Sequence, residues 1–149
     1  MKKIFCGLLA IAAFCSTALA ENGSVTWHVD AQKALKAAAA QNKQILVLVT
    51  GSTWCGPCMN LEKNVLKSKD FAAFAGKNLI LLKADIPRRG IPQGPTPQRT
   101  VLDMVKHQGG VPSVYLLSSK GKVLENVSGY GGGNTETYLK RFKKLEGTK

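Results

Sequence analysis

Two cysteines, Cys55 and Cys58, stand three residues apart in the run Trp54-Cys55-Gly56-Pro57-Cys58. Residues at this spacing are neighbours on a helix, so the two sulfurs can reach disulfide distance without distorting distant parts of the chain. A sulfur at the start of a helix lies near unpaired N–H groups and the positive end of the helix dipole, which stabilise a thiolate. The pair therefore predicts reversible thiol–disulfide chemistry.

The two cysteines are expected to play different parts. We expect Cys55, at the helix start, to be the exposed nucleophile. Cys58 lies one turn further on, with Leu61 and Val65 on the same face, so we expect it to be the buried thiol that resolves the mixed disulfide. Pro57 lacks an N–H, costs nothing in the first turn and stiffens the link between the sulfurs.

The cysteine pair also fits two roles without redox turnover. One is a purely structural disulfide, although so small a loop stabilises little. The second is a dithiol that carries copper or zinc. The two histidines, His28 and His107, lack the ligand spacing of a zinc site, so we expect no metal site and no cofactor. We expect His28 in a strand and His107 in the last turn of a helix, where it suits the terminal carbonyls.

Apolar periodicity and turn residues predict the elements that position the pair. The predicted strands are 24–29, 45–50, 79–85, 113–117 and 123–127, and the predicted helices are 31–41, 59–66, 68–76, a helix from Thr96 to Gly109, and one that Asn134 caps. The buried-looking strands joined by helices favour parallel pairing, and the last two strands favour an antiparallel hairpin. The sequence predicts one α/β domain.

The first twenty residues are predicted to be a cleaved secretory signal. A basic start precedes the apolar stretch 4–14, and small residues lead to a cut after Ala20, which leaves a single domain over 21–149. A lipoprotein signal ending at Cys15 is disfavoured because a bulky Phe precedes it. An uncleaved membrane anchor is a further alternative. We expect a periplasmic protein, with secretion the less favoured location.

Removal of the predicted signal lowers both the number of cysteines and the net charge. Of four cysteines, Cys6 and Cys15 leave, and the loss of Lys2 and Lys3 lowers the formal charge from +12 to +10. The remaining excess is mostly lysine on helix faces. No aromatic residues alternate with the basic ones as in nucleic-acid-binding proteins, so we expect no nucleic-acid partner. We also expect the protein to be a monomer.

The motif after an apolar strand, at the opening of a helix, resembles the active site of the thioredoxin family. Gly110-Val111-Pro112 is similar to the family's cis-proline loop, and the element order resembles the family across 24–146. The resemblance implies a thioredoxin-like fold, with a central mixed sheet flanked by helices. It also implies supporting roles for Trp54, Gly56, Pro57 and Pro112, and a backbone edge at Val111 that pairs with a client strand.

Two features of the family are missing. The buried acid of the cytosolic members would stand at Leu48 or Val49, where there is no carboxylate, although Lys83 matches the lysine near that acid. Lys63 stands in place of the kinking proline of the next helix.

Without that acid, we expect resolution by Cys58 to be slow near neutral pH and to accelerate as the pH rises. The proton could leave through water entering at Thr50 or Thr53, to the thiolate of the leaving partner, or to Asp85 if its strand end turns inward.

The resemblance implies an exported thiol–disulfide oxidoreductase, with protein disulfides as substrates and a membrane thiol as electron donor. Gly-Pro between the cysteines is similar to the reducing members. The turn 50–53 is more similar to periplasmic thioredoxin-like proteins than to the cytosolic one. The alternatives are a disulfide oxidant or isomerase of the same fold, and a metal-handling dithiol.

The loop 87–98 should emerge at the sheet edge that carries Cys55, because parallel strands end on the same side. We therefore expect Arg88 and Arg89 to contact clients. The alternative is a rigid spacer, since four of the six prolines lie in this loop.

Overall fold

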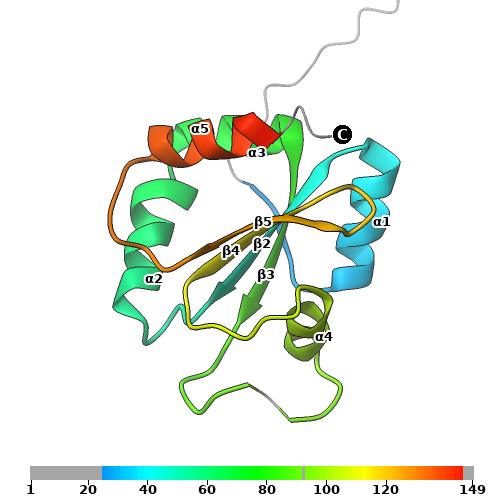
Figure 1. Cartoon of the computed structure of the whole chain (residues 1–149), viewed down its shortest axis with the longest axis vertical. Helices are drawn as coiled ribbons and strands as arrows, with labels where there is room; N and C mark the ends of the chain where they lie inside the picture. The colour runs from blue at the N-terminus through cyan, green and yellow to red at the C-terminus, as the bar shows by residue number, and fades with distance from the viewer. Residues whose placement is uncertain (1–24, 92, 146–149) are drawn as a thin grey trace, which may run out of the picture.

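The structure of the protein is a computed structural model that describes residues 25–91 and 93–145 (Figure 1). The predicted signal 1–20 lies outside the described residues. None of the helices described is both long enough and apolar enough to cross a bilayer.

Five strands form one mixed sheet at the centre of the molecule. They are β1 (Trp27–His28), β2 (Gln44–Thr50), β3 (Leu79–Asp85), β4 (Ser113–Leu117) and β5 (Val123–Ser128), in the spatial order β1-β3-β2-β4-β5. β3 runs parallel to both β1 and β2, and β4 runs antiparallel to both β2 and β5. The predicted mixed sheet is confirmed, with a first strand much shorter than 24–29.

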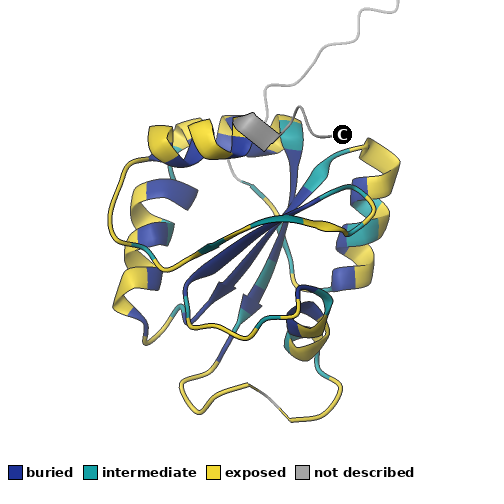
Figure 2. Ribbon diagram, in the orientation of Figure 1, coloured by how far each residue is buried: buried dark blue, intermediate teal, exposed yellow. Residues whose placement is uncertain are grey.

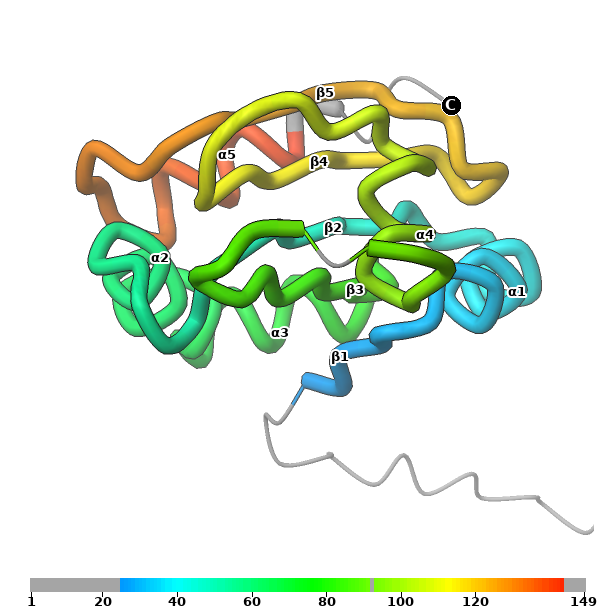
Figure 3. The backbone as a smooth tube through the Cα atoms, turned by 90° about the horizontal axis from the view of Figure 1, so that it is seen from below, coloured from blue at the N-terminus to red at the C-terminus, as the bar shows by residue number. Residues whose placement is uncertain are grey.

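Helices cover both faces of the sheet, as Figures 1 and 3 show. They are α1 (Ala31–Gln41), α2 (Gly56–Leu61), the π-helical turn η1 (Glu62–Leu66), α3 (Lys69–Asn78), α4 (Pro97–Met104) and α5 (Thr135–Leu145). α1 and α4 pack on one face, and α2, η1, α3 and α5 pack on the other. The side chains of Asp30, Ser68 and Thr96 accept backbone N–H groups at the starts of α1, α3 and α4, as N-caps do.

β2 is the central strand and is buried on both sides (Figure 2). Its alternate residues divide between the two halves of the core: Val47 and Val49 join the cluster beneath α1 and α4. Leu46 and Leu48 join the cluster that contains Leu61 of α2. Of the two positions where the missing acid would stand, Leu48 is therefore the one on the side of α2.

The end of α4 corrects one prediction. The helix stops at Met104, and the expectation that it continues to Gly109 with His107 in its last turn is wrong. Lys106 adopts a left-handed conformation (φ 51°), and the N–H of His107 donates to the carbonyl of Leu102 at 2.9 Å. This is a Schellman-type ending, which normally uses glycine or asparagine, so a lysine there gives no warning in the sequence.

Candidate active site

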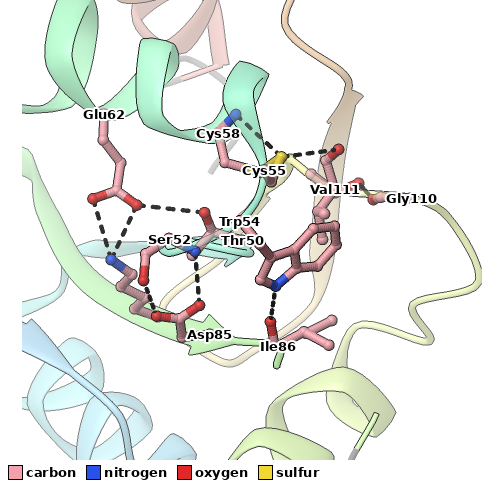
Figure 4. Close-up of a disulfide and its surroundings, with 12 residues drawn as sticks. Thr50, Ser52, Trp54, Cys55, Cys58, Glu62, Asp85, Ile86, Gly110 and Val111 are labelled. Carbon is pink, nitrogen blue, oxygen red and sulfur yellow. Dashed lines mark hydrogen bonds and ion pairs between the residues drawn. A yellow bond between two sulfur atoms is a disulfide. The ribbon is translucent and has the colours of Figure 1, made fainter. Parts of the chain in front are cut away.

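The two cysteines lie where β2 turns into α2. Cys55 is the N-cap of α2, and its Sγ accepts a hydrogen bond of 3.2 Å from the backbone N–H of Cys58 (Figure 4). The two sulfurs are joined in a disulfide, with their Cα atoms 5.2 Å apart. The predicted helix start and the disulfide reach of the pair are both confirmed. A reduced Cys55 in this place has an N–H group directed at its sulfur, which favours the thiolate.

Burial distinguishes the cysteines less than expected. Cys58 is fully buried, as are Leu61 and Val65 on the same face. Cys55, expected to be exposed, is only 6% exposed, so that expectation is wrong for the disulfide form. Its sulfur turns inward, toward the N–H of Cys58 and toward the carbonyl oxygen of Val111 at 3.7 Å. Cys55 remains the more accessible of the two.

A loop from the other side of the sheet borders the disulfide. The Val111–Pro112 bond is cis, as the resemblance implies, and the backbone of Val111 lies beside Cys55. The carbonyl of Pro112 accepts the N–H of Gly129 at 2.7 Å, and the hydroxyl of Ser113 donates to the carbonyl of Gly110 at 2.8 Å. These two hydrogen bonds, at Gly110 and at Pro112, flank Val111 and hold its backbone beside the disulfide.

Trp54 links the motif to the loop after β3. Its indole N–H donates to the carbonyl of Ile86 at 2.8 Å, and its ring lies against Gly51, where a Cβ atom would approach the ring to 2.4 Å. Trp54 and Met59 are the exposed large apolar residues of this segment, 38% and 46% exposed. Such a surface beside a reactive sulfur suits contact with an unfolded or extended polypeptide.

Asp85, at the end of β3, holds the turn that precedes the motif. Its carboxylate accepts the backbone N–H of Ser52 at 2.9 Å and also the Ser52 hydroxyl. The carboxylate is thus directed to Ser52, with which it makes both of its side-chain hydrogen bonds among the described residues. Asp85, one of the proton acceptors that the sequence offers, therefore has a structural role of its own.

A carboxylate that sequence analysis missed lies close by. Glu62 extends toward the sheet, where its Oε1 lies 3.0 Å from Nζ of Lys83 and accepts the hydroxyl of Thr50 at 3.4 Å (Figure 4). Lys83 pairs in register with Leu48, a position where the family's acid would stand. The sequence does carry a signal: Glu62 follows Cys58 by four residues and therefore returns to the same side of the helix. The family's acid lies on the strand, so the resemblance does not point to a helical residue.

The remaining predicted residues are placed as follows. Gly56 and Pro57 form the exposed first turn of α2, and Pro112 is buried in the cis-proline loop. Arg88 and Arg89 are exposed on the loop that Ile86 begins. Within 25–91 and 93–145, no group of three or more His, Cys, Asp and Glu residues is arranged to hold a metal ion.

Comparison with known proteins agrees with this geometry. The family model described as thioredoxin-like matches residues 26–119, which include both cysteines and the cis-proline. The chain belongs to the thioredoxin-like family. The resemblance inferred from the motif is thereby confirmed.

The thioredoxin-like relatives include two proteins of Chlamydia pneumoniae. The chain is 28% identical over 123 residues to the disulfide bond reductase DsbH, covering 80% of this chain and 72% of DsbH. It is 26% identical over 133 residues to the thioredoxin-related protein DsbJ, covering 87% of this chain but 38% of that protein.

Solved structures show the same thioredoxin-like fold. A DsbH oxidoreductase superposes with a TM-score of 0.67 at 24% identity, covering 97% of this chain and 93% of the other. A thioredoxin from Thermus thermophilus superposes with a TM-score of 0.62 at 15% identity, covering 82% and 87%. The predicted fold class is confirmed.

Proposed function

We propose that this thioredoxin-like thiol–disulfide oxidoreductase works as a reductase of protein disulfides outside the cytosol. The observation that carries the proposal is the disulfide between Cys55 and Cys58 at the start of α2, with the backbone of Val111 beside it. The similarity to a protein named disulfide bond reductase supports the reducing direction, as does Gly-Pro between the cysteines.

The geometry supports a two-step exchange. In the reduced protein, the Cys55 thiolate attacks one sulfur of a client disulfide, which forms a mixed disulfide and releases the other client sulfur as a thiolate. The Cys58 thiolate then attacks Cys55 Sγ, so the Cys55–Cys58 bond forms and the second client sulfur leaves. Two protons from the protein thiols balance the two client thiols. The client gains two electrons, and the protein ends as the disulfide seen here.

The proposed location and electron donor rest on the sequence. The signal predicted over 1–20 supports export to the periplasm, and an oxidising periplasm would leave the pair as a disulfide unless a donor reduced it. A membrane thiol protein fed from the cytosol is the donor we propose, and we propose that the protein acts as a monomer.

We also propose that the loop after β3 contributes to client binding. The hydrogen bond between Trp54 and Ile86 anchors this loop beside the motif. Arg88 and Arg89 are exposed on it, and Ile91 is 38% exposed. The loop therefore presents two cations and an exposed apolar side chain, and it is anchored to the cysteine motif at its first residue. A rigid spacer would need neither kind of side chain.

Insulin reduction in the presence of a dithiol reductant tests the activity, beside titration of the reduced protein with Cu(I) and Zn(II). The proposal expects catalysed reduction that is abolished in the Cys55→Ser variant. Tight metal binding without catalysed reduction would instead support the metal-handling alternative and contradict the proposal.

A further inference from the structure

The second step of the proposed cycle has an unmet chemical requirement. Cys58 must lose its proton before it attacks, and it is completely buried on the same helix face as the buried Leu61 and Val65, where a thiolate is disfavoured. β2 offers no acid, because Leu48 and Val49 occupy the candidate positions. Asp85 is engaged by Ser52. The proton therefore needs a different acceptor.

Glu62 meets the positional requirement. It follows Cys58 by one helical turn, and the N–H of Glu62 donates to the carbonyl of Cys58. Residues four apart on a helix face the same side, which here is the side that packs on β2 and β3. The carboxylate lies over the ends of these two strands, where it contacts Thr50 of β2 and Lys83 of β3.

The partners of Glu62 bind it from the sheet. Lys83 contacts both carboxylate oxygens, at 3.0 Å and 3.2 Å, and the hydroxyl of the fully buried Thr50 donates to Oε1 at 3.4 Å. In the view of Figure 4, Thr50 lies between Glu62 and the cysteine pair. The side chain of Glu62 is 15% exposed and that of Lys83 is 22% exposed, so both retain contact with solvent.

We propose that Glu62 is the proton acceptor for Cys58, acting through the Thr50 hydroxyl or a water molecule next to it, with Lys83 holding the carboxylate in place. The inference rests on the proposed reductase cycle and concerns its second step. The Cys58 proton passes to the Glu62 carboxylate as the Cys58 sulfur bonds to Cys55. The client sulfur leaves with the electron pair of the broken bond, and Glu62 then returns its proton to solvent.

The surrounding charges are consistent with this role. Lys83 from β3 is the cation that faces the carboxylate, and Thr50 from β2 is its neutral partner. Asp85, also from β3, faces Ser52, and Lys63, the next residue along the helix, is exposed to solvent. Glu62 can therefore act as a carboxylate base that lies one helical turn from Cys58 and retains contact with water.

The test follows the two thiol releases when reduced protein reacts with an aromatic disulfide that yields coloured thionitrobenzoate. The first release reports attack by Cys55, and the second reports resolution by Cys58. We expect the second release in the unmodified protein to vary little from about pH 6 to about pH 9, in contrast to the pH dependence that the missing strand acid predicts. In Glu62→Gln it should fall about 100-fold near neutral pH and recover as the pH rises.

The control is Glu136→Gln, which removes another helical glutamate that pairs with a lysine, Lys140, on the exposed face of α5. Both release rates should be unchanged in it. The first release should also be unchanged in Glu62→Gln, because a merely disordered site would slow both steps.

An unaltered pH profile of the second release in Glu62→Gln overturns the assignment of Glu62. If that variant does not fold, Glu62→Asp replaces it: the shorter side chain should slow the second release near neutral pH only, and no slowing overturns the assignment equally. Failure of the unmodified protein to release the thiol at all contradicts the proposed function, so the two failures are distinguishable.

Discussion

The indole nitrogen of Trp54 and the carbonyl oxygen of Ile86 are 2.8 Å apart, and this hydrogen bond joins the cysteine motif to the loop after β3. Trp54 follows β2 and Ile86 follows β3, and the ends of these strands are further joined by the hydrogen bond from the N–H of Ile86 to the carbonyl of Thr50. A client that approaches Cys55 therefore meets a surface formed by the turn after β2 and the loop after β3. The two hydrogen bonds fix the position of one relative to the other.

Gly51 leaves the space that the Trp54 ring needs to reach Ile86, because a Cβ atom at this position would lie 2.4 Å from the ring. We expect Gly51→Ala to displace the ring, to break its bond to Ile86, and to lower the free energy of unfolding by about 1–3 kcal/mol. Tryptophan fluorescence should report the displaced ring, and denaturant unfolding the lost stability. The control is Gly76→Ala within α3, where a Cβ meets nothing within 4 Å. In this control the free energy of unfolding should rise by about 0.5–1 kcal/mol, because alanine is favoured over glycine inside a helix. Equal stability of the two variants would contradict the packing argument.

The roles of the cysteines predict asymmetric trapping of clients. Cys58→Ser should accumulate mixed disulfides through Cys55, because the first attack proceeds and the second cannot. Cys55→Ser should accumulate none, since Cys58 is fully buried. Non-reducing electrophoresis of the purified variants with a disulfide-containing client measures both. Equal trapping by the two variants would show that the roles are wrongly assigned.

Substitution of Arg88 and Arg89 should change the rate of reduction of large substrates only. We expect Arg88→Ser with Arg89→Ser to slow reduction of a protein client severalfold and to leave reduction of a small aromatic disulfide unchanged, because only the larger substrate reaches the loop. A suitable comparison is Lys33→Ser with Lys36→Ser on α1, on the opposite face of the sheet from α2. An unchanged rate with the protein client would favour the rigid-spacer interpretation.

Much of the fold follows from local patterns in the sequence. Apolar runs predict β2 and β3 almost to the residue, and Asp30 and Asn134 predict the starts of α1 and α5, where Asn134 accepts the N–H of Thr137. These features are local, because an apolar run and a helix cap are each formed by residues that are close together in the sequence.

What the sequence could not supply depends on contacts between distant elements. The inward turn of the Cys55 sulfur depends on Val111, which lies far along the chain. The carboxylate beside Lys83 comes from a helix instead of the neighbouring strand, so strand positions alone do not predict Glu62. In both cases, tertiary packing determines where the side chain goes.

His107 should make stability depend on pH. Its Nδ1 shares a hydrogen bond of 2.8 Å with the hydroxyl of Tyr115, and partial burial holds the pKa of His107 below its ordinary value, against a weaker opposing effect of the Gly109 backbone. The unfolded chain therefore takes up the proton first as the pH falls. The free energy of unfolding should decrease as the pH falls through about 6.5.

Denaturant unfolding at a pH on either side of this value measures the effect. His107→Gln should weaken the pH dependence, whereas His28→Gln, which removes the other histidine, should preserve it. A pH dependence that survives the removal of His107 would show that another group causes it.

The central claim, that the pair is a reductant, is tested most directly by the reduction potential of the Cys55–Cys58 disulfide, measured at equilibrium against glutathione or a dithiol buffer. Thioredoxin has a potential of about −270 mV and the strong periplasmic oxidant one of about −120 mV. We expect a value below about −240 mV, at which the reduced pair can donate electrons to most strained or exposed client disulfides. A value above about −180 mV would contradict the account and would favour a disulfide oxidant or isomerase.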